Sequence, residues 1–269
     1  MPHRPRKRFG QNFLVDFDVI ERIVAAIAPS RGEPIIEIGP GRGELTRPLL
    51  AAGADLHVVE IDRDLAADLP RQVPGLAADH IHVGDALEVD LACLLRLRSG
   101  ERFRVVGNLP YNISTPLLVR LAKSSGVIRD MHFMLQKEVV DRMAAAPGGK
   151  DYGRLTLMCQ YHFAVVPLFT VPPEVFEPAP KVESGFVRLI PHDTPPAEVP
   201  DFATLERLVA QAFSQRRKTL RNSLRPLMAA AQIEEAGVDP ALRAEALSLR
   251  DFARLAQVMA HYEGESGQR

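Results

Sequence analysis

The sequence is short of several features that mark particular classes of protein. It has only two cysteines in 269 residues, and Cys93 and Cys159 lie far apart without metal-ligand spacing. A disulfide framework or a cysteine-ligated metal is therefore not expected. No apolar stretch approaches the roughly 20 residues that span a bilayer, and the basic N-terminus lacks the apolar core of a secretory signal. These absences indicate a protein of the reducing cytoplasm, with no membrane anchor and no bound metal.

An excess of charge of one sign is also missing, because the net charge is −1. The charge is nevertheless patterned. Residues 3–8 form one basic cluster, and no acidic residue occurs between Arg207 and Ile233. This second basic stretch holds Arg216, Arg217, Lys218, Arg221 and Arg225. A charge run is often no more than a solvated surface, but two separate clusters favour a polyanionic partner.

Short apolar runs recur along the first part of the chain, each ending in a polar residue. The spacing between Glu37, Glu60, Asp85 and Asn108 is 23 to 25 residues, about one strand, one helix and two turns. Continuous Val/Ile runs are typical of parallel strands buried on both faces. We therefore expect a doubly wound α/β domain. The predicted strands are 34–38, 56–59, 80–83, 104–106, 131–135, 163–171 and 185–190, and the predicted helices are 44–52, 64–69, 115–123, 137–146 and 153–161.

A proline-rich stretch at 191–200 predicts a linker, because four of its ten residues are proline. The pattern beyond it is helical, so we expect a first domain over 1–190, with a basic N-terminal arm at 1–14, and a small all-helical domain over 201–269. Arg217, Arg221 and Arg225 recur at four-residue steps and would share one helix face, although Pro226 should break or kink that helix.

The first strand ends in Glu37-Ile38-Gly39-Pro40-Gly41-Arg42-Gly43. Glycines at this turn let the backbone approach a ligand closely. They fall at every second position, which departs from the GxGxxG pattern of dinucleotide sites and favours a smaller adenosyl ligand. Glu60 and Asp85 end the next two strands, where they could accept hydrogen bonds from ribose hydroxyls and from an adenine amino group.

The fourth strand ends in Asn108-Leu109-Pro110-Tyr111. This segment combines an amide, a carbonyl aimed by proline and a flat ring, which together suit a flat heterocycle with an exocyclic amine. On its own an Asn-X-Pro segment is usually a turn. Four successive strand ends that supply Gly, Glu, Asp and Asn-Leu-Pro-Tyr are much more specific, since ligands bind beyond the carboxyl ends of the strands in open α/β sheets.

In these motifs and others along its length, the chain resembles the bacterial small-subunit (16S) rRNA adenine N6,N6-dimethyltransferases almost from end to end. The motifs that carry the resemblance lie at residues 11–14, 37–41, 107–116, 131–139, 152–155, 176–182 and 215–219. The resemblance implies a Rossmann-like class I methyltransferase domain with a C-terminal helical domain that recognises rRNA. It also implies S-adenosylmethionine as methyl donor, two adjacent adenosines near the 3′ end of 16S rRNA as acceptors, and a role in small-subunit biogenesis.

The resemblance also assigns roles to the cofactor-binding residues. Asn12 and Leu14 would close over the methionine end of the cofactor, and Gly39 would lie under it. Glu60 would hold the ribose and Asp85 the adenine. Asn108 would line both the cofactor and the substrate pockets.

The chemistry of adenine suggests how the substrate is held. Its amino nitrogen is a poor nucleophile, and hydrogen bonds to the Asn108 side-chain oxygen and the Leu109 carbonyl, aimed by Pro110, would favour a pyramidal nitrogen. Tyr111 would stack on the flipped base and Phe176 could cover its other face, at roughly 1–3 kcal/mol per stacked base. The expected phosphate contacts are Arg217, Lys218 and Arg221.

Two other kinds of function stay open from the sequence. Another adenine-N6 methyltransferase could act on large-subunit rRNA or on DNA, although DNA enzymes tend to carry proline where Leu109 stands. A non-catalytic ribosome-assembly or transcription factor could retain the fold without the activity. The intact set of strand-end residues favours the enzyme, and we expect it to act as a monomer on RNA within the small (30S) subunit or its precursor.

Overall fold

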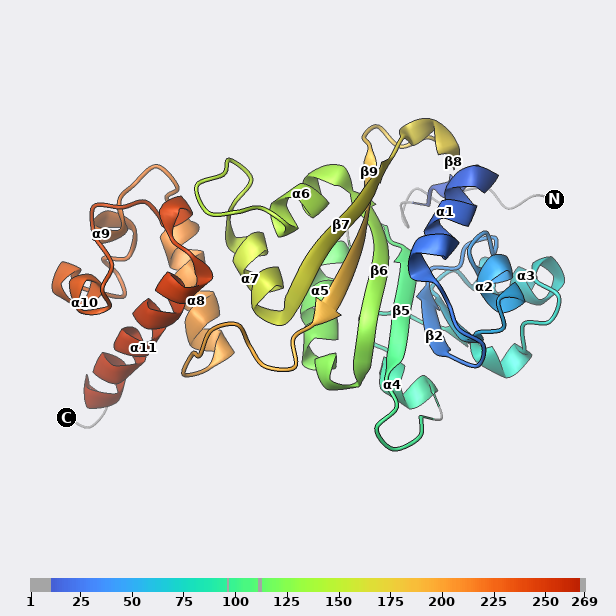
Figure 1. Ribbon diagram of the computed structural model, residues 1–269, viewed down its shortest axis with the longest axis horizontal. Coiled ribbons are helices and arrows are strands. Elements are labelled where there is room, and N and C mark those ends of the chain that lie inside the picture. The colour runs from blue at the N-terminus through green and yellow to red at the C-terminus, as the bar shows by residue number, and fades with distance from the viewer. Residues whose placement is uncertain (1–10, 96, 111–112, 267–269) are drawn as a thin grey trace. The chain divides into compact units, whose positions relative to one another are not determined.

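The structure is a computed structural model, and it describes residues 11–95, 97–110 and 113–266. The chain divides into two compact units (Figure 1). The first comprises Met1–Val140 and Val165–Pro191, and the second comprises Asp141–Ala164 and His192–Arg269. None of the helices in the described ranges has both the length and the apolar character needed to cross a membrane.

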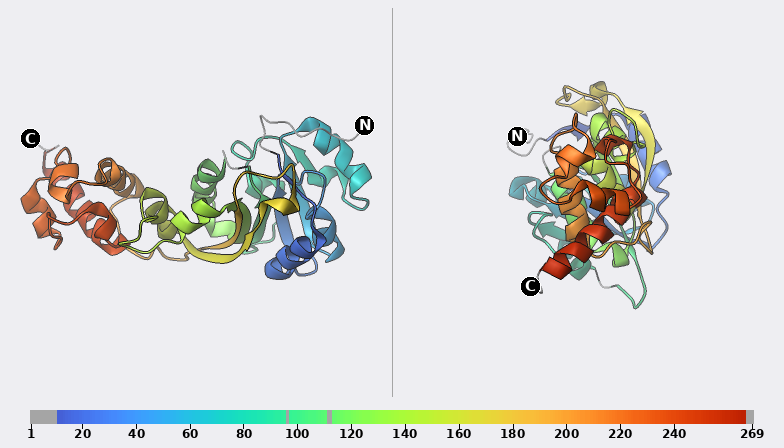
Figure 2. Two further views of the ribbon diagram at one scale, coloured as in Figure 1. Left: turned by 90° about the horizontal axis from the view of Figure 1, so that it is seen from above. Right: turned by 90° about the vertical axis from the view of Figure 1, so that its left-hand side faces the viewer.

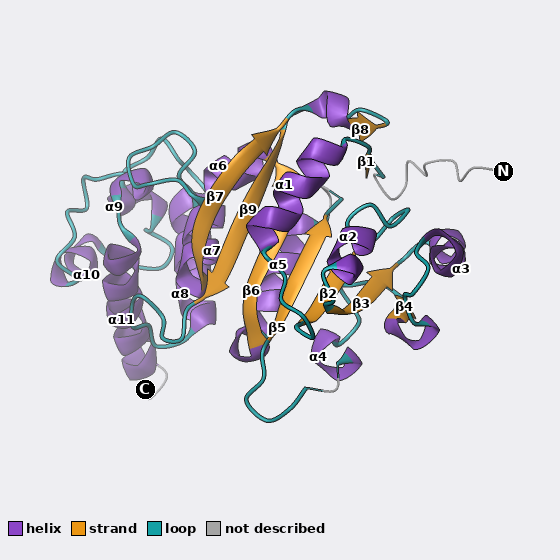
Figure 3. Cartoon of the chain, turned by 45° about the vertical axis from the view of Figure 1, so that its right-hand side comes forward, coloured by secondary structure: helices purple, strands orange, loops and turns teal. Residues whose placement is uncertain are grey.

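A seven-stranded sheet forms the centre of the first unit (Figure 3). Its strand order is β4-β3-β2-β5-β6-β9-β7; the strands β2 to β6 run parallel, and β9 pairs antiparallel with β6. This order confirms the predicted doubly wound α/β class. The strands are β2 (Pro34–Ile38), β3 (Asp55–Glu60), β4 (Ile81–Val83), β5 (Phe103–Asn108), β6 (Ile128–Gln136), β7 (Phe163–Val171) and β9 (Ser184–Pro191).

Helices cover both faces of this sheet. Helix α1 (Phe17–Ile27) lies on one face and α5 (Ser114–Lys123) on the other (Figures 1 and 2). On the α1 face, apolar side chains of α1, α2 (Thr46–Ala51) and α3 (Arg63–Gln72) pack into one core cluster with side chains of the strands. The shorter helices of this part of the chain are α4 (Leu91–Leu94) and α6 (Lys137–Met143).

A second, two-stranded sheet was not predicted. In it β1 (Phe13–Leu14) pairs antiparallel with β8 (Phe176–Glu177), so that Leu14 lies opposite Phe176. Two residues are too few to show a strand periodicity, and the partners are far apart in the sequence. The pairing places the N-terminal motif beside the proline-rich segment around Phe176.

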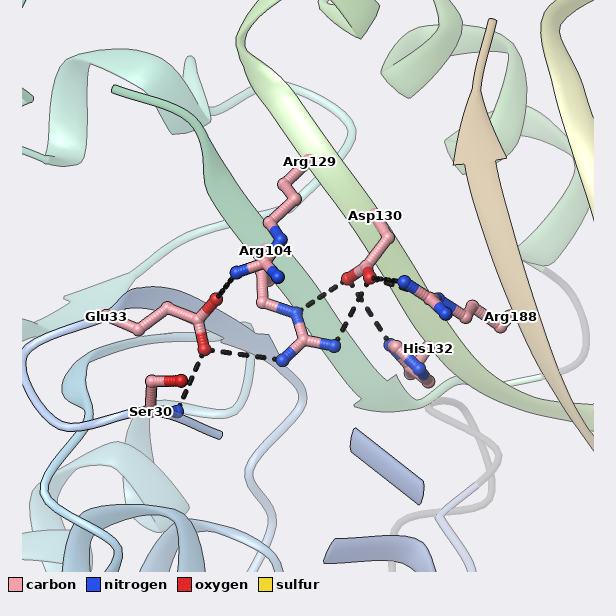
Figure 4. A network of polar contacts seen from close by, with 7 residues as sticks. All are labelled: Ser30, Glu33, Arg104, Arg129, Asp130, His132 and Arg188. Atoms are coloured by element: carbon pink, nitrogen blue, oxygen red, sulfur yellow. Dashed lines mark hydrogen bonds and ion pairs between the residues drawn. The ribbon is translucent and has the colours of Figure 1, made fainter. Parts of the chain in front are cut away.

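Buried charges tie the strands together at the end of the sheet where β5 begins (Figure 4). The Arg104 guanidinium on β5 donates to Asp130 on β6 at 2.6 Å and to Glu33, just before β2, at 3.3 Å. Arg188 on β9 donates to the other oxygen of Asp130, at 2.6 Å. Asp130 is completely buried, so its charge depends on these two arginines, and losing the buried Arg104 would be costly. The network therefore fixes which strands pair.

The second unit is helical. Its helices are α7 (Arg154–His162), α8 (Phe202–Phe213), α9 (Leu220–Ser223), α10 (Ala230–Glu235) and α11 (Leu249–Ser266). One division of the chain falls after Pro191, next to the predicted linker, and residues 141–164 belong to the same compact unit as the helices beyond residue 192, whereas the sequence predicts one domain over 1–190. Tyr152, Leu157 and Tyr161 are buried in the same cluster as apolar residues of α8 and α11, and the Tyr152 hydroxyl donates to the Leu247 carbonyl at 2.7 Å.

The predicted linker contains neither helix nor strand between residues 192 and 201. It is nevertheless bonded to the helical unit. The His192 N–H donates to the His162 carbonyl at 3.0 Å, and the Gln257 side chain donates to the Glu198 carbonyl at 2.9 Å. This segment is therefore part of the second unit.

The predicted helix face of Arg217, Arg221 and Arg225 does not form. Helix α9 spans only Leu220–Ser223, so Arg217 lies in the turn before it and Arg225 in the turn after it. Pro226 has no N–H to donate and disfavours helical backbone at the residue before it. The proline explains why the helix ends before Arg225, and the turn and bend over residues 214–218 separate Arg217 from α9.

Candidate cofactor and base site

A cavity of about 300 Å³ opens at the carboxyl ends of the parallel strands in the first unit. Its lining contains the described residues that the sequence predicts to bind the cofactor or the target base. They are Asn12, Leu14, Gly39, Glu60, Asp85, Asn108, Leu109, Pro110 and Phe176. These residues converge from the N-terminal motif, four strand ends and β8, as one shared ligand site requires.

The glycine-rich turn after β2 adopts backbone conformations that favour glycine. Gly39 has φ +70° and Gly41 has φ +60°. A Cβ at Gly41 would lie 3.1 Å from the Phe13 ring, whereas a Cβ at Gly39 would meet no atom closer than 3.9 Å. Gly39 is therefore bounded by open space on the cavity side, and a side chain there would occupy room that a ligand needs.

Two carboxylates are positioned by backbone N–H groups around this turn. The buried Glu60 accepts from the Asp62 N–H at 2.9 Å and from the Gly41 N–H at 3.2 Å. Asp85 accepts from the Leu87 N–H at 2.8 Å. Each carboxylate has about four acceptor positions, so both keep capacity for ligand hydroxyl or amino groups.

Glu37 lines the same cavity and was not predicted as a site residue, although it belongs to the glycine-rich motif. Burial, strengthened by the nearby Glu44 and Glu60, raises the pKa of its carboxyl group to about 8. Its Oε2 atom has no hydrogen-bond partner among the described residues. A buried polar atom left without a partner at a cavity wall suits a ligand with polar groups, so this donor set fits an adenosyl cofactor.

Apolar walls of the cavity were also missed. Ile61 directly follows Glu60, and Ala86 directly follows Asp85. Their position immediately after strand-end carboxylates is the signal by which the sequence could have identified them. They add apolar surface beside the polar groups, which is the usual composition of a small-molecule site.

The orientation of Asn108 is fixed by a long-range hydrogen bond. Its side-chain nitrogen donates to the Asn12 carbonyl at 2.9 Å, so the side-chain oxygen remains as an acceptor. The Leu109 N–H donates to the Met134 carbonyl on β6 at 3.2 Å, which anchors the segment to the sheet. The Leu109 carbonyl accepts no hydrogen bond from the part of the chain that the structure describes. Two acceptors are thus available at the end of β5.

Of the two aromatic residues predicted to stack on the base, only Phe176 is among the described residues. Tyr111 lies outside the described residues. Phe176 lines the cavity but is only 5% exposed and packs in the core cluster with Phe186. Most of the Phe176 ring is therefore used in packing, and the part that faces the cavity is what could contact a ligand.

The basic residues of the second unit are of two kinds. Arg216 forms an ion pair with Glu245 at 3.0 Å and donates to the Lys150 carbonyl, so it holds the turn before α9 in place. Arg217, Lys218 and Arg221 are exposed and form no ion pair within the described ranges. The latter three are available for an external anion. The N-terminal basic cluster at 3–8 lies outside the described residues.

Comparison with known proteins gives a consistent result. A family model described as ribosomal RNA adenine dimethylase matches residues 2–261. The chain is 55% identical over 262 residues to the ribosomal RNA small subunit methyltransferase A of Pseudomonas aeruginosa, covering 97% of each protein.

Solved structures support the fold. A dimethyladenosine transferase from Plasmodium falciparum is similar with a TM-score of 0.76 and 24% identity, over 94% of this chain and 98% of that one. The 23S rRNA methyltransferase ErmE is similar with a TM-score of 0.67 and 27% identity, over 93% of this chain and 100% of that one.

These findings confirm the resemblance drawn from the motifs, together with the predicted fold class, enzyme class and cofactor. The chain belongs to the ribosomal RNA adenine dimethylase family, whose members are S-adenosylmethionine-dependent methyltransferases.

Proposed function

We propose that this protein dimethylates the N6 amino groups of two adjacent adenosines near the 3′ end of 16S rRNA. The observation that carries the proposal is the pair of acceptors at the end of β5, the Asn108 oxygen and the Leu109 carbonyl, at the wall of the cavity that also holds Glu60 and Asp85. The choice of the small subunit rests on 55% identity to a small-subunit methyltransferase, against 27% to a 23S rRNA methyltransferase.

The cavity residues fit a cationic cofactor. Glu44, Glu60 and Asp85 line the cavity, and those of these carboxylates that are ionised favour a ligand that bears positive charge. S-adenosylmethionine would supply an activated methyl group on its sulfonium when bound. The carboxylates would favour this cation over the neutral product, which would help release.

The acceptors at the end of β5 prepare the adenine nitrogen. In the proposed mechanism, both N6–H groups donate to fixed oxygens, which favours a pyramidal nitrogen with its lone pair directed at the methyl carbon. The new N–C bond forms as the S–C bond breaks, and the proton that N6 loses passes to solvent. No strong base is needed, and positioning of this kind contributes perhaps 7–11 kcal/mol in favourable cases. After the first transfer one N–H remains to be held.

The rest of the substrate is held outside the cavity. A target base has to leave its stack to reach the pocket, and we assign Tyr111 and the exposed part of Phe176 to stacking on it. Arg217, Lys218 and Arg221 bind phosphates, which position the RNA without reading its sequence. The natural acceptor is the RNA within the small (30S) subunit or its precursor, and the enzyme acts as a monomer in the cytoplasm during subunit biogenesis.

The experiment that tests this function compares four acceptors in parallel with labelled S-adenosylmethionine. They are undermethylated small ribosomal subunits, naked small-subunit rRNA, large-subunit rRNA and duplex DNA, and digestion to nucleosides identifies the product. We expect dimethyladenosine from the small-subunit acceptors alone. Label in large-subunit rRNA or DNA would overturn the substrate but keep the chemistry. Cofactor binding without any transfer would favour the non-catalytic assembly factor.

A further inference from the structure

Three histidines and an aspartate gather at the open edge of the sheet, away from the cavity. Asp55 and His57 lie on β3. His80 ends the short 3₁₀ helix Ala78–His80 directly before the neighbouring edge strand β4, and His82 lies within β4. Figure 3 shows β4 at the end of the sheet beside β3. Asp55 begins β3 whereas Glu60 ends it, so the cluster and the cavity lie toward opposite ends of the strand.

The side chains of this cluster are already close to a ligand arrangement. One ligand atom from each of Asp55, His57 and His80 lies within 4.8 Å of the other two. The Asp55 Oδ1 atom is 4.0 Å from His57 Nε2 and 3.8 Å from His80 Nδ1. Ligands about 2.0–2.1 Å from a tetrahedral Zn²⁺ are separated by roughly 3.3 Å, so the three side chains have to move closer together than the 4.8 Å within which their ligand atoms now lie.

The fourth residue, His82, orients the central histidine. His57 Nδ1 lies 3.0 Å from His82 Nε2. When His57 Nδ1–H donates in this bond, His57 Nε2 carries the lone pair on the side of Asp55. Metal-bound histidines typically use their second nitrogen for a hydrogen bond of this kind, which fixes the tautomer and the ring orientation.

His80 is oriented by a hydrogen bond of its own. Its Nδ1 lies 3.1 Å from the Leu56 carbonyl, and because a carbonyl oxygen only accepts, Nδ1 carries the proton and Nε2 is the nitrogen that can coordinate an ion. The His57 and His80 rings stack at 3.8 Å with an interplanar angle of 16°. Coordination needs the two rings to tilt so that both lone pairs point at the ion, and the partly exposed His80 side chain has room to do so.

We propose that Asp55, His57 and His80 bind one divalent transition-metal ion of the zinc class, with His82 as the orienting partner of His57. Imidazoles with a carboxylate suit zinc, cobalt, nickel or copper, whereas magnesium and calcium prefer oxygen ligands throughout. The site departs from the sequence-based expectation of no metal, because that expectation considered cysteines and ligand spacing along the chain. His57 and His80 are 23 residues apart and meet only through pairing of β3 with β4.

The ion would stabilise the edge of the sheet. Strand β4 has only three residues and pairs only with β3 in the main sheet, and an ion bound by both strands would hold it there. Asp85, two residues beyond β4, lines the cofactor cavity. The proposed site is therefore structural: its ligands take no part in the proposed methyl transfer, although the strand it holds leads directly to Asp85.

The test uses the full-length protein after dialysis against a chelator. Zn²⁺ binding is measured by calorimetry, and Co²⁺ binding by its visible absorption. We expect one equivalent bound and a thermal midpoint raised by roughly 5–10 °C at a hundredfold excess over Kd. The variants Asp55→Asn and His80→Gln change partly exposed side chains. Each should lose more affinity than the roughly 10–100-fold typical of losing an outer partner.

A matched control carries His3→Gln and His261→Gln, which remove two histidines outside the cluster. It should bind one equivalent with the affinity of the parent protein. Unchanged binding in an Asp55→Asn/His80→Gln double variant would overturn the proposal, as would the absence of stoichiometric binding in the parent protein. Binding that leaves the thermal midpoint unmoved would overturn the stabilising role.

Discussion

Among single residues, Asn108 shows how one hydrogen bond determines chemistry. Its side-chain nitrogen is bonded to the Asn12 carbonyl, so only its oxygen is left to accept from a substrate amine. The sequence placed Asn108 at a strand end, but its anchor lies 96 positions earlier. A contact of that span cannot be inferred from periodicity.

Replacing Asn108 with alanine should therefore reduce transfer far more than cofactor binding. Loss of one fixed hydrogen-bonding group that acts in the transition state typically costs about 10²–10³ in turnover. Single-turnover transfer and calorimetric binding of S-adenosylmethionine would be measured on the same preparation. The matched control is Asn222→Ala on α9, which should keep both. Equal losses of binding and transfer in the Asn108 variant would contradict the assigned role.

The sequence did not identify Glu37 as a site residue, because the protonation of its carboxyl group depends on burial. Its carboxyl group has an ordinary pKa of 4.5 but a pKa of about 8 in the folded protein. The unfolded chain therefore loses this proton first as the pH rises, and the folded state keeps it. The sequence shows a glutamate in a glycine-rich motif, whereas its protonation follows from side chains packed around it.

The stability contribution of Glu37 should consequently be present in full below pH 4.5 and lost as the pH rises toward 8. From this group alone the free energy of unfolding should fall by up to about 5 kcal/mol over that interval. Denaturant unfolding without cofactor, followed from pH 5 to 8, would measure the fall. Glu37→Gln should flatten it, and the exposed Glu21→Gln should not. A slope that is identical in the parent and in Glu37→Gln would contradict the buried, protonated state.

At the scale of elements, the strands of the sheet were the most predictable part. Strand β2 was predicted with its observed bounds and β3 to within one residue, because parallel strands buried on both faces are continuous apolar runs. The two-residue strands β1 and β8 could not be predicted, since their pairing depends on tertiary contact. The helix face predicted for Arg217, Arg221 and Arg225 is wrong for local reasons: a turn separates Arg217 from α9, and the helix ends before Arg225 and the proline that follows it.

The basic residues around α9 carry the same charge but make different contacts. Arg216 is paired with Glu245, whereas Arg217 and Arg221 are exposed on either side of the start of α9. Sequence alone gave these residues the same interpretation. The ion pair is what distinguishes a residue that holds the turn from residues that can bind phosphate.

Reversing Arg217 and Arg221 to glutamate should weaken rRNA binding and reduce its salt dependence. Each lost phosphate contact lowers the slope of log K against log salt by about 0.7–0.9. Equilibrium binding at several salt concentrations would measure this on each single variant and on the double variant, with the exposed Arg250→Glu as the charge-matched control for each single reversal. A change confined to the turnover of bound substrate would contradict the phosphate-binding role.

At the scale of the whole molecule, the sequence indicated two domains and the position of the last boundary. It did not indicate that residues 141–164 belong with the helices beyond residue 192. The helical pattern of residues 153–161 is compatible with either unit, because amphipathicity shows that a face is buried without showing against what. The burial of Tyr152 and Leu157 among α8 and α11 side chains settles the matter.

The interleaved division has a consequence for how the protein can be taken apart. The chain passes between the units three times, at 140/141, 164/165 and 191/192, so no single cut releases either unit whole. A fragment starting at residue 201 would lack the Tyr152, Leu157 and Tyr161 side chains and leave their apolar pockets open to water. Grafting the helical unit onto another scaffold thus requires both of its segments, 141–164 and 192–269. The unit cannot be transferred by one end-to-end fusion.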